Sequence, residues 1–91
     1  MTIERIVELT KNKIGFELDV INNILGKQEK QFARGAAKIV LNNIDGMLSL
    51  ATNMIYHADA ELAEKEQAVK KLQEWEKDFT ANARAEVSYR D

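Results

Sequence analysis

The chain contains no cysteine and no proline, and it has only four glycines and one histidine among its 91 residues. The lack of cysteine excludes disulfide scaffolds, thiolate zinc sites and cysteine nucleophiles. One histidine cannot form a multi-histidine metal site or a paired-histidine catalytic centre. The glycines have none of the spacings of a phosphate-binding loop, a nucleophile elbow or a dinucleotide fingerprint. We therefore expect no enzyme, no metal and no cofactor.

Charge of one sign is also lacking, because 13 Lys and Arg face 15 Asp and Glu and leave a net charge of −2. Such a balance gives no global attraction to nucleic acid or to an anionic membrane. No apolar run approaches the roughly 18 residues of a membrane-spanning helix. The first residues also lack the basic start and apolar stretch of a signal peptide. The expected location is therefore the cytoplasm.

The composition that remains is that of a folded protein, with 45% hydrophobic and 31% charged residues. A chain of this length suits one domain, residues 1–91. Because proline is absent and apolar residues recur at helical spacing, the expected fold class is all-α. The spacing predicts helices over residues 2–25, 28–57 and 60–88, packed as an elongated antiparallel three-helix bundle.

A second architecture is also consistent with this pattern. Residues 58–60 contain neither glycine nor proline, so nothing in them forces a turn. Residues 28–88 are thus consistent with one long helix as well as with two. The alternative fold is a helical hairpin or a long helix that assembles through oligomerisation.

The first two expected helices have unusually wide apolar surfaces. On a helical wheel their apolar residues cover about 200°, whereas the usual stripe is closer to 100°. An arc of this width needs more than one neighbour, so we expect a homo-oligomer. The candidate interface residues lie on the second helix and are Leu41, Ile44, Leu48 and Ile55, with Asn43 inside the same arc. A buried asparagine can fix register and oligomer number.

Two segments of the chain resemble each other. Residues 15–26 and 35–46 both fit the pattern G-x4-V-[IL]-N-N-I-x-G, with an offset of 20. One interpretation is two helix ends that each close on a glycine cap, at Gly26 and Gly46. The other is a duplicated contact element. The sequence leaves both open.

A row of four cations follows the first expected helix: Lys27, Lys30, Arg34 and Lys38. Their spacings of 3, 4 and 4 predict one side of the second helix. Four cations on one face are typical of a surface that binds phosphate groups. The alternative is a solvated face that pairs with the acidic third helix. No aromatic residue lies within this stripe of cations on the expected helix face, which gives no support to base stacking.

Two functional hypotheses follow. The first is a small, non-enzymatic, oligomeric helical interaction protein, an adaptor or inhibitor that occludes the surface of a protein partner. The second is an anion-binding module that binds or sequesters nucleotides, a phosphorylated signal or nucleic acid through the four cations. Neither hypothesis involves a membrane.

Overall fold

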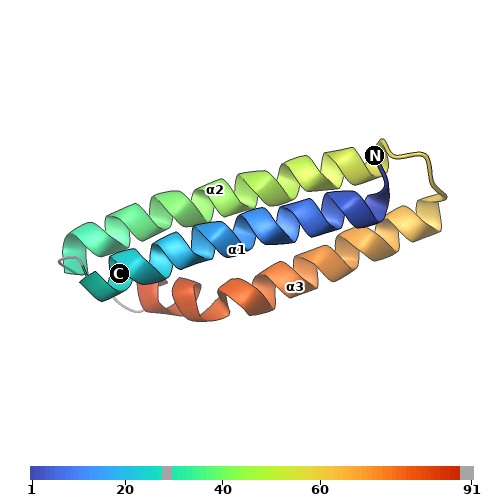
Figure 1. Cartoon of the computed structure of the whole chain (residues 1–91). Coiled ribbons are helices and arrows are strands. Elements are labelled where there is room, and N and C mark those ends of the chain that lie inside the picture. The colour runs from blue at the N-terminus through green and yellow to red at the C-terminus, as the bar shows by residue number, and fades with distance from the viewer. Residues whose placement is uncertain (28–29, 89–91) are drawn as a thin grey trace.

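The structure, a computed structural model, describes residues 1–27 and 30–88, and the side chains of residues 1–26 and 32–87. It contains three helices, α1 (Ile3–Lys27), α2 (Lys30–Tyr56) and α3 (Leu62–Ser88), and no strand within the described residues. The helices lie side by side, and α1 and α3 both begin at the end where α2 finishes (Figure 1). The predicted all-α three-helix bundle is confirmed, and each helix boundary falls within two residues of its expected position.

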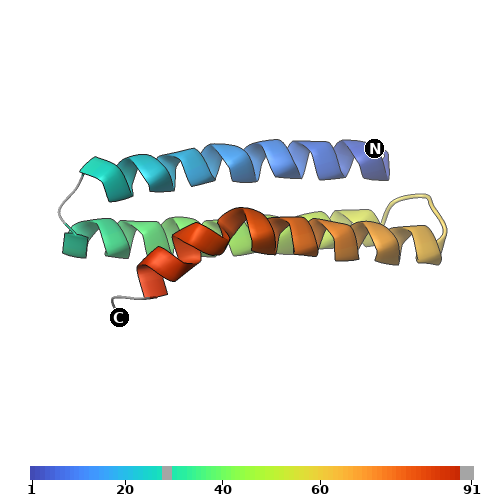
Figure 2. The same cartoon turned by 90° about the horizontal axis from the view of Figure 1, so that it is seen from below.

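The bundle is a rod. Its extents are 47 × 20 × 15 Å and its radius of gyration is 14.7 Å, whereas a compact domain of this length has a radius of gyration of about 12 Å. Viewed from below, α3 lies across α2 at an angle, and α1 runs alongside the pair (Figure 2). No helix in the described ranges combines the length and the hydrophobicity needed to span a membrane.

The first helix begins at a side-chain cap. The backbone N–H of Arg5 donates to Oγ1 of Thr2 at 3.2 Å, and the N–H of Ile6 donates to the carbonyl of Thr2 at 3.1 Å. Threonine is a favoured residue at this position because its hydroxyl accepts from an otherwise unbonded N–H. Glu4 then lies in the first turn, where the helix dipole favours a negative charge.

The end of α2 decides between one long helix and two. Because a carbonyl oxygen only accepts, Nδ1 of His57 donates to the carbonyl of Asn53, at 2.7 Å. The ammonium of Lys65 donates to the carbonyl of Tyr56 at 2.9 Å. These bonds satisfy carbonyls that the end of a helix leaves without partners. Side chains, rather than glycine or proline, therefore accompany the turn over residues 57–61, and the single-helix alternative is wrong.

The core consists of two clusters along the rod. Nearer the α1–α2 connection it contains Ile14, Ile21, Ala37, Leu41, Ile44, Ala83 and Val87. At the opposite end it contains Ile3, Ile6, Ala51, Ile55, Val69 and Leu72. Half-buried Trp75 packs against both clusters, its ring stacks on Phe79 with 4.7 Å between the centroids, and the ammonium of Lys11 lies 5.3 Å from its ring centroid. Trp75 thus connects the two halves of the core.

The glycines do not end helices. All four lie within α1 or α2, and no described glycine has a positive φ. The interpretation of the repeat as two helix ends capped by Gly26 and Gly46 is therefore wrong, because α1 continues to Lys27 and α2 continues through Gly46, as the expected helix over residues 28–57 requires. A Cβ atom placed on any of them would meet nothing within 4 Å. Among the described residues, no contact requires these positions to be glycine.

Candidate functional site

The first candidate surface is a set of large apolar side chains that the bundle leaves exposed on α1 and α2. The set is Leu9 and Phe16 on α1 and Phe32, Ile39, Leu50 and Met54 on α2, of which Phe16, Phe32, Ile39 and Leu50 are 61–68% exposed. Within each helix, neighbouring members of the set are 7, 11 or 4 residues apart. These spacings place the members on α1 on one side of α1, and the members on α2 on one side of α2. Leu9, Leu50 and Met54 line one pocket between α1 and α2, so both stripes lie on the same side of the molecule. We call this surface the outer face.

The outer face is poor in charge. Between Ile39 and Tyr56 the only charged residue is Asp45, and its Oδ1 accepts a bond from Nη2 of Arg84 on α3 at 2.8 Å. On the α1 side, exposed Lys13 lines the same pocket as Leu9, Leu50 and Met54. Depletion of charge, rather than hydrophobicity alone, distinguishes the centre of a protein–protein interface from ordinary surface.

The structure places the predicted interface residues differently from the sequence analysis. Leu41, Ile44 and Ile55 are buried in the core of this chain, and half-buried Leu48 packs against the second core cluster. These side chains pack in clusters with residues of α1 and α3 of the same chain, so they are not available to a second copy. Asn43 is exposed and follows Ile39 by one turn, on the outer face. The apolar surplus that the helical wheel indicated on α2 is exposed at Ile39, Leu50 and Met54.

The basic row is divided between the end of α1 and the first turns of α2. Lys27 is the last residue of α1 and Lys30 the first of α2, and their side chains lie outside the described residues. Arg34 is half-buried and Lys38 is exposed, and each already interacts with another residue. At helical spacing, Arg34 shares a flank of α2 with Asp45, which pairs with α3. The arrangement resembles the solvated, internally paired alternative more than an open phosphate site.

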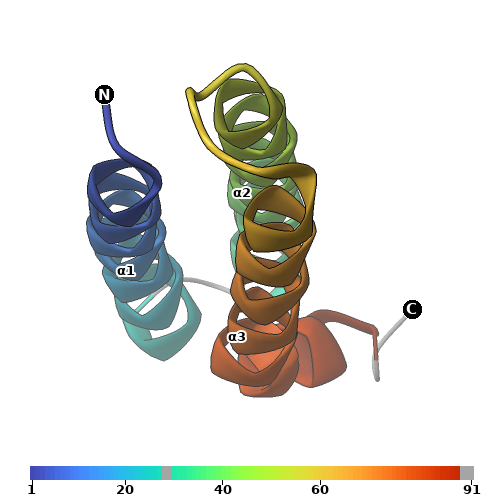
Figure 3. The ribbon, with the colours of Figure 1, turned by 90° about the vertical axis from the view of Figure 1, so that its right-hand side faces the viewer.

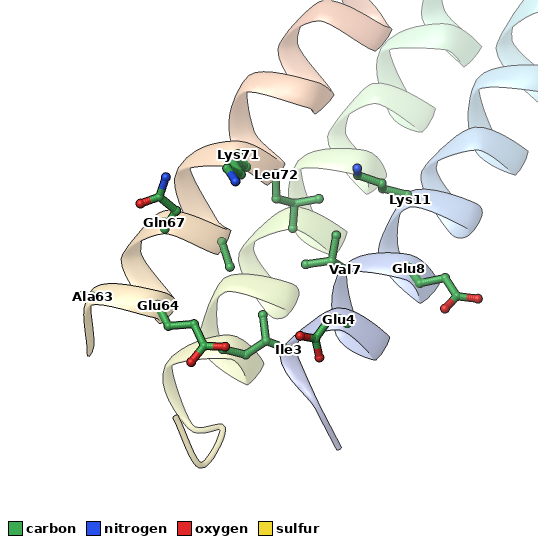
Figure 4. Close-up of a pocket in the computed structure, with 11 residues that line it drawn as sticks. Ile3, Glu4, Val7, Glu8, Lys11, Ala63, Glu64, Gln67, Lys71 and Leu72 are labelled. Atoms are coloured by element: carbon green, nitrogen blue, oxygen red, sulfur yellow. The ribbon is translucent and has the colours of Figure 1, made fainter. Parts of the chain in front are cut away.

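The second candidate surface is a groove between α1 and α3. An end-on view shows α1 to one side of the molecule and α3 to the other (Figure 3). The groove has a volume of about 720 Å³. Its apolar side chains are Ile3, Val7, Ala63, Ala68 and Leu72, and its polar ones are Glu4, Glu8, Lys11, Glu64, Gln67 and Lys71 (Figure 4). No residue of this groove was singled out from the sequence, because it depends on how α1 and α3 are spaced.

A third feature is a polar network between α3 and α2. Nη2 of Arg84 donates to Oε1 of Glu76 at 2.6 Å, and Nε of Arg84 donates to Oγ1 of Thr80 at 3.0 Å. Thr80 is fully buried, and the Glu76 side chain is 9% exposed. Partial burial by itself lowers the pKa of Arg84, but its bonds with Glu76 and Asp45 outweigh this effect and raise that pKa. The network was missed from the sequence, although its i, i+4, i+8 spacing was visible.

Both carboxylates of the network accept bonds from Arg84. Glu76 does so in a buried position, whereas the Asp45 side chain is 56% exposed and is bonded through Oδ1. Over the described part of the chain, no three His, Cys, Asp or Glu side chains come together as a metal-binding group. Comparisons with protein-family models, with curated proteins and with solved structures find no match to this chain. The two apolar surfaces are the features from which function can be argued.

Proposed function

We propose that this protein is a small, non-enzymatic helical interaction protein that covers part of a partner protein with its outer face, as an adaptor or an inhibitor. The observation that supports the proposal best is the outer face itself, where Phe16, Phe32, Ile39 and Leu50 are more exposed than buried. Single exposed apolar residues are ordinary, but a contiguous stripe over two helices is typical of an interaction site.

The amount of exposed surface supports a protein partner. The accessible area of the chain is 6218 Å², whereas size scaling gives about 5,400 Å² for a globular protein of this mass. The elongated shape gives this surplus of about 800 Å², which is comparable in size with the share that one partner contributes to a standard protein–protein interface.

The chemistry of the outer face favours a protein over the other partners considered. A helix that lies on a membrane flanks its apolar stripe with Lys and Arg, whereas exposed Asn42, Ser49 and Asn53 lie beside this stripe. The anion-binding hypothesis has weaker support, because Arg34 and Lys38 already interact with other residues. A cysteine-free composition suits a reducing compartment, so the proposed place of action is the cytoplasm.

The proposed function also includes self-association, which is argued from a different surface of the molecule. The groove between α1 and α3 is a second surface with apolar lining, where half-buried Val7 and Ala68 and exposed Ala63 lie over the buried core residues Ile3 and Leu72. A protein with both surfaces can pair with its own copy through one and with a different protein through the other.

Site-specific photo-cross-linking tests the outer face directly. The photoreactive residue p-benzoylphenylalanine replaces Ile39 in one variant and Glu66, which is exposed on α3, in the control. We expect ultraviolet light in the native cells to give a discrete adduct with a different protein from position 39 and not from position 66. Equal adducts from both positions, or none from position 39, would contradict the proposal.

A further inference from the structure

The groove between α1 and α3 has an apolar floor and a charged rim. Ile3 and Val7 line it from α1, and Ala68 and Leu72 line it from α3 (Figure 4). Because α1 and α3 begin at the same end of the rod, residues at equal distances from their starts lie at similar heights along the groove (Figure 1). The two rims can therefore be compared position by position.

The rims repeat one charge pattern. Glu4 and Lys11 lie on the α1 rim and Glu64 and Lys71 on the α3 rim, and in both cases the base follows the acid by seven positions. Seven residues of helix correspond to about 10 Å. One end of the groove is thus acidic on both sides, and the other end is basic on both sides.

These charges are not neutralised along the rims. Within the described part of the chain, Glu4, Glu64 and Lys71 form no ion pair. Glu8, near the middle of the α1 rim, instead pairs with Arg5 at 3.3 Å. The ammonium of Lys11 lies 5.3 Å from the Trp75 ring centroid, which holds it at the basic end. An occupant of the groove that has the opposite charge order would neutralise both ends.

We propose that the occupant is a second copy of this chain, docked groove to groove and antiparallel. A two-fold axis across the helices would place Glu4 opposite the partner's Lys11, and Glu64 opposite the partner's Lys71. The parallel alternative would place Glu4 opposite the partner's Glu64, where like charges repel. The charge pattern therefore selects one of the two face-to-face arrangements.

The antiparallel arrangement would also cover the apolar residues that line the groove. The α1 and α3 helices of both copies form a four-helix bundle, in which the apolar floors become a shared core. Gln67, near the middle of the α3 rim, meets its own equivalent without a charge conflict. Glu8, near the middle of the α1 rim, also meets its own equivalent, and the ion pair with Arg5 of the same helix offsets the repulsion between the two carboxylates. This inference deepens the self-association in the proposed function and rests on it, but it is independent of the outer face.

Charge reversal tests the arrangement with the full chain alone. An acidic variant combines Lys11→Glu with Lys71→Glu, and a basic variant combines Glu4→Lys with Glu64→Lys. A matched control for the acidic variant, Lys70→Glu with Lys77→Glu, makes the same change in net charge. Both of its residues are exposed on α3 and do not line the groove. Sedimentation equilibrium gives the self-association of each variant, and circular dichroism confirms that each remains helical.

We expect the wild type and the control to dimerise, and each reversed variant to dimerise at least about tenfold more weakly, because several attractive pairs become repulsive. An equimolar mixture of the acidic and basic variants should restore a dimer of one copy of each. If both reversed variants dimerise as strongly as the wild type, the groove is not the interface. A wild type that stays monomeric would overturn the proposal as well. In either case the outer face would still be tested by the cross-linking at position 39.

Discussion

Arg84 shows how single residues determine the way in which α2 and α3 meet. It binds Glu76 and Thr80 on its own helix and Asp45 on α2. Glu76 and Thr80 are buried, so Arg84 supplies the positive charge and the donors that they need there. The carboxylate of Asp45 then fixes the register of α2 against α3, which apolar contacts alone specify less sharply.

We expect Arg84→Ala to lower the free energy of unfolding by about 2 kcal/mol, because it leaves the buried Glu76 carboxylate without its partner. The value is below that of a fully buried pair because the Arg84 side chain is 35% exposed. Arg5→Ala is the control, since its pair with Glu8 is exposed, and we expect a change below about 0.5 kcal/mol. Urea unfolding measures both variants, and equal losses would contradict this role of Arg84.

The raised pKa of Arg84 predicts how the effect depends on pH. A cation with a folded-state pKa above its unfolded value stabilises the fold at all pH values below the unfolded one. For arginine that stabilisation is lost only above about pH 12. The stability difference between wild type and Arg84→Ala should therefore stay constant from pH 7 to pH 10. A difference that shrinks over this range would show that another group controls the network.

Arg34 provides the test of the anion-binding hypothesis. Because it is half-buried and already has an interaction, we expect isothermal titration of the wild type with ATP or with a short oligonucleotide to show no binding at low or at moderate salt. Binding that weakens with salt and disappears in Arg34→Glu would contradict this expectation and restore the phosphate site.

At the scale of the helices, the sequence was sufficient for most of the fold because the apolar spacing repeats over many turns. It could not specify the turn at 57–61, because His57 and Lys65 cap α2 from outside the helix. The sequence also could not specify which part of the wide apolar arc of α2 is buried, because this depends on where α1 and α3 lie. In the structure Ile44 is buried and Ile39, in the same arc, is exposed.

The glycines give a prediction for α2. Gly46 lies inside the helix, its φ is negative, and a Cβ there would meet nothing within 4 Å. We expect Gly46→Ala to stabilise the chain by about 1 kcal/mol, because alanine loses less backbone entropy in a helix. Thermal unfolding should show a higher midpoint. A lower midpoint would indicate that a second chain approaches the helix at this position.

At the scale of the whole molecule, the rod has one filled core and two unfilled apolar surfaces. The core uses the residues that the sequence first assigned to an interface, such as Leu41 and Ile44. The outer face uses residues of the same helix on its other side, such as Ile39 and Leu50. Stability and interaction are therefore separable by mutation along α2.

We expect Ile39→Lys with Leu50→Lys to change the free energy of unfolding by less than about 1 kcal/mol, because both side chains are exposed. Ile44→Ala, in contrast, should cost about 2–5 kcal/mol, because Ile44 is fully buried and leaves a cavity. Denaturant titrations measure both losses. A large loss from the exposed pair would show that the outer face is part of the fold of this chain.

Native mass spectrometry of the tagged chain, recovered from its own cells, tests both proposed interfaces together. We predict a complex that holds two copies of this chain together with a different protein. In the Ile39→Lys, Leu50→Lys variant the different protein should be lost and the pair of copies kept, whereas Lys70→Glu with Lys77→Glu should keep both. A wild-type chain recovered only as a monomer would contradict both interfaces.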